Sequence, residues 1–191
     1  MKKFLSFFLI LIMLFSFSSC KNNRNTICQH EEKLLPFLPL EFSHTIPSED
    51  FYTKIKIEAD GCFTGSFYDT EPEEIGDDYP GGTVYSTGFS GKFERIEKLG
   101  DTSYKLYLGE ITYLEELNSS KIQDGINYIT AKLEGLNENT EYILYTKEAP
   151  TDGLHDVFLF NWPYLGTNAE QLSCYGLMNT KNNAGFFAYS K

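Results

Sequence analysis

The stretch FYTKIKIEADGCFTGSFYD, residues 51–69, decides the fold, because it reads as two alternating strands joined by a turn. In residues 51–58 the odd positions carry apolar side chains or threonine, and the even positions carry tyrosine, lysine or glutamate. A period of two is typical of a strand with one buried and one wet face. The pair Asp60-Gly61 tolerates the positive backbone angles of a tight hairpin turn. Residues 62–69 are therefore predicted to return as the second strand of a hairpin.

The same rhythm continues downstream and predicts about eight strands at hairpin spacing. Few helical patterns interrupt it, and 16% of the residues are aromatic. These features indicate an all-β, mainly antiparallel fold, either a lipocalin-like barrel of about eight strands or a sandwich, with one short helix. The helix is expected within residues 149–162, capped by Asp152. The further predicted strands cover residues 83–98, 103–114, 126–133, 140–148, 174–179 and 184–190.

The first twenty residues read as an export signal. Lys2 and Lys3 precede an apolar run from Phe4 to Phe17, and at about 14 residues this run is short for a membrane-spanning helix, which needs roughly 20. The ending Ser18-Ser19-Cys20 looks like a lipoprotein signal whose cysteine is acylated. We therefore expect Cys20 to carry lipid that anchors the chain at the cell envelope, outside the cytoplasm. An ordinary cleaved signal and an uncleaved anchor remain alternatives.

These features divide the chain into three parts. Residues 1–20 form the lipoprotein signal peptide, residues 21–41 a tether, and residues 42–191 a single β-rich domain. Within the tether the polar first half is predicted to be a flexible spacer. The apolar stretch from Leu34 to Phe42 is expected to lie against the domain.

The charge is strongly acidic. The formal net charge is −11, and removal of the signal with its two lysines leaves 14 positive against 27 negative groups, or −13. Such a chain repels phosphate backbones, so a nucleic-acid partner is not expected. The membrane is expected to be reached through the lipid alone. The field attracts a cationic protein or peptide, or a metal ion; the alternative is that the charge only keeps an exported domain soluble.

The candidate contact surface is the acidic loop DTEPEEIGDDYPGG, residues 69–82. It does not fit the EF-hand pattern, because the sixth and twelfth positions from Asp69 are Glu74 and Pro80 instead of glycine and a carboxylate. An irregular Ca²⁺ site remains open, and no other metal or cofactor is predicted. The candidate residues are Asp69, Glu71, Glu73, Glu74, Asp77, Asp78 and Tyr79.

Other chemistry is sparsely supported. No catalytic residue is predicted: the histidines lie outside any zinc motif, and Gly88-Phe89-Ser90-Gly91 is one residue short of a nucleophile elbow. Cys62 and Cys174 are expected either to form a disulfide or to be two buried thiols. Trp162, in an alternating aromatic series over residues 158–164, is expected either to pack in the core or to contact a ligand at a barrel mouth.

Residues 60–93 resemble the signature block of an uncharacterised bacterial extracytoplasmic lipoprotein domain family. The matching elements are DG-F-G, an acidic loop, YP-GT and FSGKF, and later YGL-N at 175–179 and AGFF at 184–187. The resemblance implies secretion and a β-rich domain, and it transfers no catalytic residue.

Together these features predict a lipid-anchored, non-enzymatic binding or accessory domain with the acidic loop as its contact surface. Two alternatives stay open: a lipocalin-like carrier of a small apolar ligand or sugar, and a hydrolase that uses unrecognised carboxylate chemistry.

Overall fold

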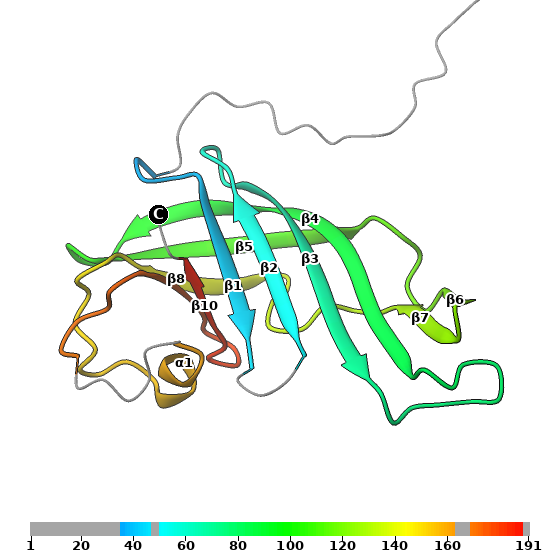
Figure 1. Ribbon diagram of the computed structural model, residues 1–191. Coiled ribbons are helices and arrows are strands. Elements are labelled where there is room, and N and C mark those ends of the chain that lie inside the picture. Colours follow the sequence, from blue (N-terminus) through cyan, green and yellow to red (C-terminus); the bar gives the residue numbers. More distant parts are fainter. Residues whose placement is uncertain (1–34, 47–49, 163–168, 189–191) are drawn as a thin grey trace, which may run out of the picture.

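Ten strands and one short helix make up the chain in the computed structural model, which describes residues 35–46, 50–162 and 169–188 (Figure 1). The elements are β1 (Leu40–Thr45), β2 (Tyr52–Ile57), β3 (Cys62–Glu71), β4 (Thr83–Lys98), β5 (Ser103–Tyr113), β6 (Ser120–Gln123), β7 (Ile126–Thr130), β8 (Thr140–Tyr145), α1 (Asp156–Phe160), β9 (Tyr175–Asn179) and β10 (Gly185–Ala188).

Eight of the strands close into an antiparallel barrel. Around the ring the order is β1, β2, β3, β4, β5, β8, β9 and β10, so each strand pairs with its neighbours in the chain apart from the excursion through β6 and β7. The ring closes where Ser43 of β1 pairs with Phe187 of β10. The all-β, antiparallel prediction is confirmed, and between its two alternatives the structure is the barrel.

The strand that completes the ring is one that the sequence did not reveal. The predicted strand at residues 126–133 does not belong to the barrel, since β7 runs parallel to the start of β4 and carries β6 on its other side. The eighth place is taken by β1, so the expected boundary between tether and domain falls inside this strand. Pro36 and Pro39 lie just before it. The alternating run that follows these prolines is too short to be recognised as a strand from the sequence.

Aromatic and aliphatic side chains pack inside the barrel. An eight-stranded barrel is wide enough for its inward side chains to fill the interior or to leave room for one small ligand. The hairpin of residues 51–69 contributes as predicted, with Ile55 and Ile57 almost fully buried. Phe93 lies near the centre of the cluster, with its ring centroid 5.3 Å from those of Phe63 and Tyr142. Other fully buried members are Phe42, Phe89, Leu106, Leu108 and Phe186.

Two connecting segments pack against opposite ends of this core. At the end where β9 finishes, the loop of residues 131–139 buries Leu133 and Leu136. This loop is held by the Tyr142 hydroxyl, which accepts from the backbone N–H of Asn137 at 2.7 Å. At the end where β9 begins, Phe37 stacks on Tyr175 with 5.0 Å between ring centroids.

Helix α1 covers the outside of the barrel wall. Its N-cap is His155, whose Nδ1 accepts from the N–H of Val157 at 3.1 Å, so the predicted cap at Asp152 is wrong. Asp152 instead lies in the preceding turn, in which Gly153 has a φ of 80°. Phe158 packs on Phe187, with 4.8 Å between ring centroids. A second, outer cluster results, formed by Ala149, Phe158, Trp162, Leu172, Cys174 and Phe187.

The structure excludes the alternative of a disulfide between Cys62 and Cys174. Cys62 is disulfide-bonded, whereas Cys174 is a buried thiol in the outer cluster. The two cysteines are therefore not joined to each other, and the alternative of two buried thiols is right for Cys174 and wrong for Cys62.

A buried histidine lies in the core at the end covered by residues 131–139. The Nδ1–H of His44 donates to the carbonyl oxygen of Gly185 at 2.9 Å, and its ring contacts those of Phe51 and Phe186. Burial lowers the pKa of this imidazole below its ordinary value of 6.5, and the hydrogen bond to Gly185 opposes the shift only in part. The folded protein therefore resists protonation of His44.

This histidine is expected to make stability depend on pH. Below pH 6.5 the unfolded chain takes up a proton that folded His44 does not, so stability is complete above that pH and falls as the pH drops toward the lowered folded pKa. Between pH 7.5 and 5.5, wild type should lose up to about 1 kcal/mol more than His44→Asn, which keeps a donor near the Nδ1 position. Urea unfolding at both pH values measures the difference. His155→Asn is the control and should behave as wild type, and an equal pH effect in wild type and His44→Asn would contradict the assignment.

Candidate functional site

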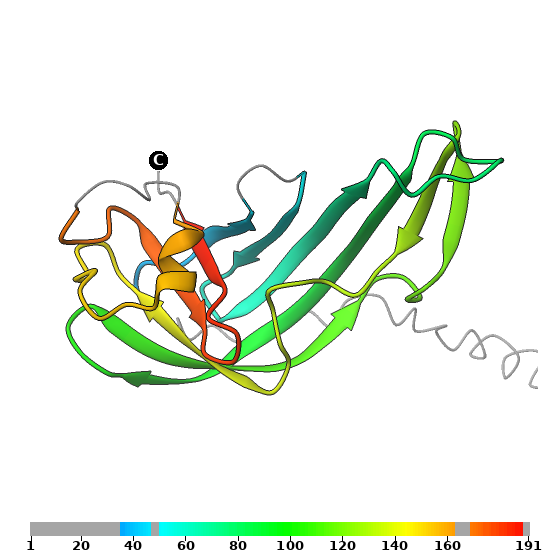
Figure 2. The ribbon, with the colours of Figure 1, turned by 90° about the horizontal axis from the view of Figure 1, so that it is seen from below.

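An acidic arm projects from the barrel. Beyond Tyr68, β3 no longer pairs with β2, and residues 83–86 of β4 pair with β7 instead of β5. The long β3–β4 pair therefore leaves the barrel together with the β6–β7 hairpin, as the right-hand side of Figure 2 shows. We define the acidic arm as residues 69–86 and 114–130. It contains nine carboxylates and one lysine, a net charge of −8.

The predicted contact residues lie at the far end of this arm. Glu71, Glu73, Asp77 and Asp78 are exposed, and Asp69 is half-buried. Like charges on an exposed loop repel one another, and these side chains do not converge. In the part of the chain that the structure describes, no three His, Cys, Asp or Glu side chains are grouped so that they could hold a metal ion.

Two of the predicted residues hold the loop in shape. The Glu74 carboxylate accepts from the Tyr85 hydroxyl at 2.6 Å, and this hydrogen bond is the main reason that the pKa of Tyr85 is raised to about 12. The Glu74 carbonyl accepts from the Thr83 hydroxyl at 2.9 Å. Tyr79 lies so close to Gly76 that a Cβ there would meet its ring at 2.7 Å. Glu74 and Tyr79 are therefore structural, whereas Glu71, Glu73, Asp77 and Asp78 face solvent.

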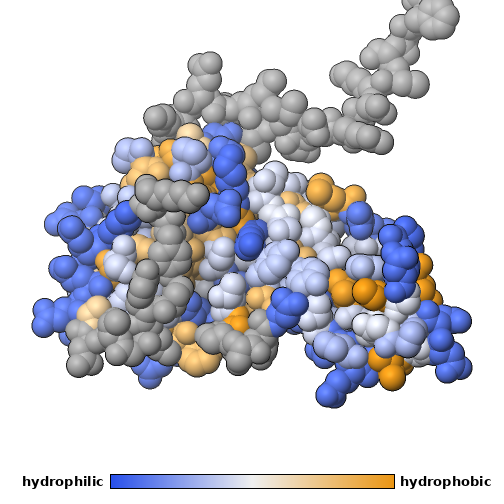
Figure 3. All heavy atoms as spheres, in the orientation of Figure 1, coloured by the Kyte–Doolittle hydropathy of each residue, from blue (hydrophilic) through white to orange (hydrophobic). Residues whose placement is uncertain are grey.

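The arm also carries exposed apolar side chains, which the sequence did not single out. Of seven large hydrophobic residues that are exposed in the described chain, four lie on the arm. Figure 3 shows apolar atoms among hydrophilic ones at the right-hand end, where Figure 1 places β6 and β7. The four are Ile75, Leu114, Ile122 and Tyr128, with exposed fractions of 61%, 70%, 47% and 38%.

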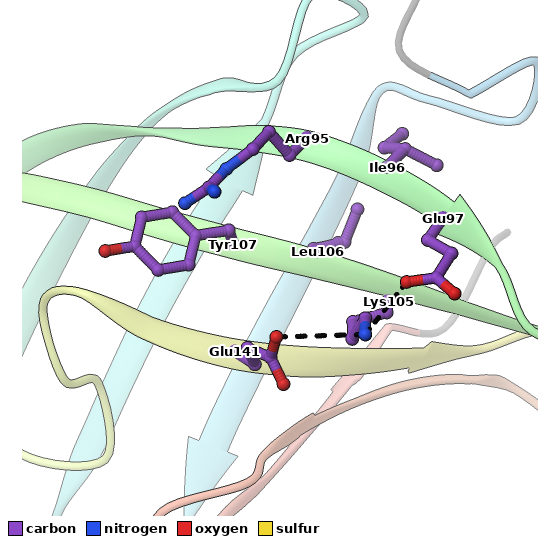
Figure 4. Close-up of a pocket in the computed structure, with 7 residues that line it drawn as sticks. All are labelled: Arg95, Ile96, Glu97, Lys105, Leu106, Tyr107 and Glu141. Carbon is purple, nitrogen blue, oxygen red and sulfur yellow. Dashed lines mark ion pairs between the residues drawn. The ribbon is translucent and has the colours of Figure 1, made fainter.

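A second candidate site, a pocket of about 300 Å³, lies in the barrel wall between β4 and β5. Glu94 pairs with Tyr107 and Glu97 with Lys105, so two residues of β4 face one residue of β5. Such a β-bulge re-aims side chains and is frequent at functional sites. Figure 4 shows the pocket. The residues that line it are Arg95, Ile96, Glu97, Lys105, Leu106, Tyr107 and Glu141.

Charged groups in this pocket are held in fixed places. Arg95 has a φ of 45°, which is unusual for a residue with a side chain. Its guanidinium carbon lies 4.1 Å from the centroid of the Tyr107 ring. The Lys105 ammonium lies 2.8 Å from Glu97 and 3.8 Å from Glu141. The only hint in the sequence was Arg95 itself, the only arginine after Arg24, and it does not indicate a pocket without the register of the two strands.

The remaining predicted site residues lie elsewhere. Trp162 is 4% exposed and belongs to the outer cluster against α1, so it packs on the outside of the barrel and does not line its interior. Cys20, the predicted lipidation site, lies outside the described residues.

Comparisons with known proteins identified no relative of this chain. A scan against family models and searches of curated proteins and of solved structures found no significant match to the chain. Within the described residues, no helix combines the length and the apolar character that are needed to cross a membrane.

Proposed function

We propose that the protein is a lipid-anchored, non-enzymatic binding domain that acts outside the cytoplasm and offers its acidic arm to a cationic protein or peptide. The observation that carries this proposal is the arm itself, in which nine carboxylates, one lysine and four exposed apolar residues share one projection. The barrel fold is also compatible with the carrier alternative. We favour the arm because it gathers exposed charge and exposed apolar side chains in one place.

Charge and apolar surface have different roles in such a contact. A field of one sign speeds the encounter with an oppositely charged partner and rejects partners of the same sign. Apolar residues within the contact supply burial that charge alone does not, at about 25 cal/mol per Å². The expected partner is therefore a basic segment that also carries apolar side chains. The predicted lipid at Cys20 would keep the arm near the membrane surface on which such a partner is met.

Neutralising the exposed end of the arm is expected to weaken binding of a basic peptide. The test variant carries Glu71→Gln, Glu73→Gln, Asp77→Asn and Asp78→Asn, and it leaves Glu74 intact because Glu74 supports Tyr85. Each exposed charge contact contributes about 0.2–1 kcal/mol, so the loss of four should weaken binding by about tenfold or more. Calorimetric titration of the domain with a peptide of alternating lysine and leucine measures the change.

The matched control removes four carboxylates that lie outside the arm. Asp101→Asn, Glu148→Gln, Asp152→Asn and Glu170→Gln change the net charge by the same amount at exposed positions. This control should bind nearly as wild type does. Wild-type binding should also weaken when salt is raised from about 0.1 M to about 1 M, since the screening length falls from about 10 Å to about 3 Å. Equal binding by both charge variants, or no binding at low salt, would remove the arm as the contact surface.

A further inference from the structure

The pocket between β4 and β5 carries opposite charges at its two ends, one cationic and one anionic. At one end Arg95 lies over Tyr107 and has no carboxylate within ion-pair distance among the described residues. At the other end Glu97 and Glu141 flank the single ammonium of Lys105, which leaves one excess negative charge. Figure 4 shows the Arg95–Tyr107 pair and the Lys105 ion pairs as two separate groups.

Ile96 and Leu106 line the pocket between the two ends. Leu106 contributes mainly its backbone there, because its side chain is buried in the barrel core. Tyr107 is fixed at one side by a hydrogen bond of its hydroxyl to the Asn139 side-chain oxygen at 3.2 Å. Tyr107 and Lys105 are two residues apart on β5, so their Cα atoms are about 7 Å apart along the strand.

We propose that this pocket binds a short peptide with free termini, of about dipeptide size. The C-terminal carboxylate would meet Arg95, whose planar guanidinium can stack on an aromatic ring and still donate in its own plane. The N-terminal ammonium would lie against the Glu141 carboxylate, which at 3.8 Å is the less tightly paired of the two glutamates that flank the Lys105 ammonium. Two extended residues span about 7 Å, which matches the spacing of Tyr107 and Lys105 along β5.

Alternative small ligands satisfy only part of the pocket. A simple anion is attracted by Arg95 but repelled by the two glutamates. A simple cation is attracted by the two glutamates but repelled by Arg95. A volume of about 300 Å³ lies at the small end of ligand sites, which restricts the ligand to a few residues at most. The inference is independent of the proposed function, because the pocket shares no residue with the acidic arm.

The test uses alanyl-leucine and two capped forms of it, one acetylated at the N-terminus and one amidated at the C-terminus. The readout is the change in backbone NMR shifts of the pocket residues during titration. Free alanyl-leucine should bind in the millimolar range, at about −4 kcal/mol. Each cap removes one charge-assisted contact and should weaken binding by about tenfold.

Variants assign each end of the peptide. Arg95→Gly removes the guanidinium, and glycine tolerates the positive φ at this position. This variant should bind free alanyl-leucine about tenfold more weakly than wild type does, and it should bind the amidated peptide as well as the free one. Glu141→Gln should specifically reduce the penalty for the acetyl group. Lys98→Gln is the control, because Lys98 pairs with Asp101 and does not line the pocket. Shifts that do not saturate, or equal affinity for free and capped peptides, would overturn the proposal.

Discussion

Replacement of Phe93 by alanine is expected to lower the free energy of unfolding by about 3–5 kcal/mol. The Phe93 side chain is fully buried in the barrel, between the rings of Phe63 and Tyr142. Its removal loses the transfer free energy of the ring and leaves a cavity that the closed wall cannot collapse to fill. Since a domain of this size is stable by about 5–15 kcal/mol, the loss is a large part of the total. Urea unfolding followed by far-ultraviolet circular dichroism measures it.

The matched control for this prediction is Phe160→Ala. Phe160 is half-exposed on α1, outside the barrel. Exposed substitutions usually change stability by less than about 0.5 kcal/mol. Similar losses for the two alanine variants would mean that Phe93 is not at the centre of a closed core.

Replacement of Cys20 by alanine is expected to abolish lipid attachment and to release the protein from the membrane fraction. The proposed anchor needs the Cys20 thiol, which alanine lacks, and each buried CH₂ of an acyl chain contributes about 0.8 kcal/mol to membrane binding. Because the variant would lack all of the acyl chains, it should be absent from the membrane fraction and not merely reduced in it. Intact mass of the purified protein and detergent-free fractionation of cells measure it.

Ser19→Ala is the control for lipid attachment, since it keeps a small residue before the cysteine. This variant should remain lipidated and membrane-bound. A Cys20→Ala protein that stays in the membrane fraction would show that another part of the chain anchors it, and the proposal of a lipid anchor would then fail.

The alternating strands were predictable because their pattern is local. The hairpin at residues 51–69 and the strand at 83–98 were visible from side-chain period and turn chemistry alone. The strand β1 was not, because its alternating run is short and follows two prolines. That β7 leaves the ring and pairs with β4 in parallel was equally hidden. Strand partners are set by long-range contacts that no local pattern records.

The candidate sites, too, were predictable only as far as they depend on local sequence. The acidic loop was evident from composition, but the structural roles of Glu74 and Tyr79 depend on partners that only the folded chain brings near. The pocket at Arg95 depends on a register shift between two strands. Register is a property of a pair of strands, so the sequence of either strand alone cannot show it.

Mapping the contact surface by NMR tests the central claim most directly. During titration of the isotope-labelled domain with the lysine–leucine peptide, backbone shifts should change within residues 69–86 and 114–130 and stay constant over α1 and the outer cluster. Shifts that cluster on α1 and leave the arm unchanged would contradict the account.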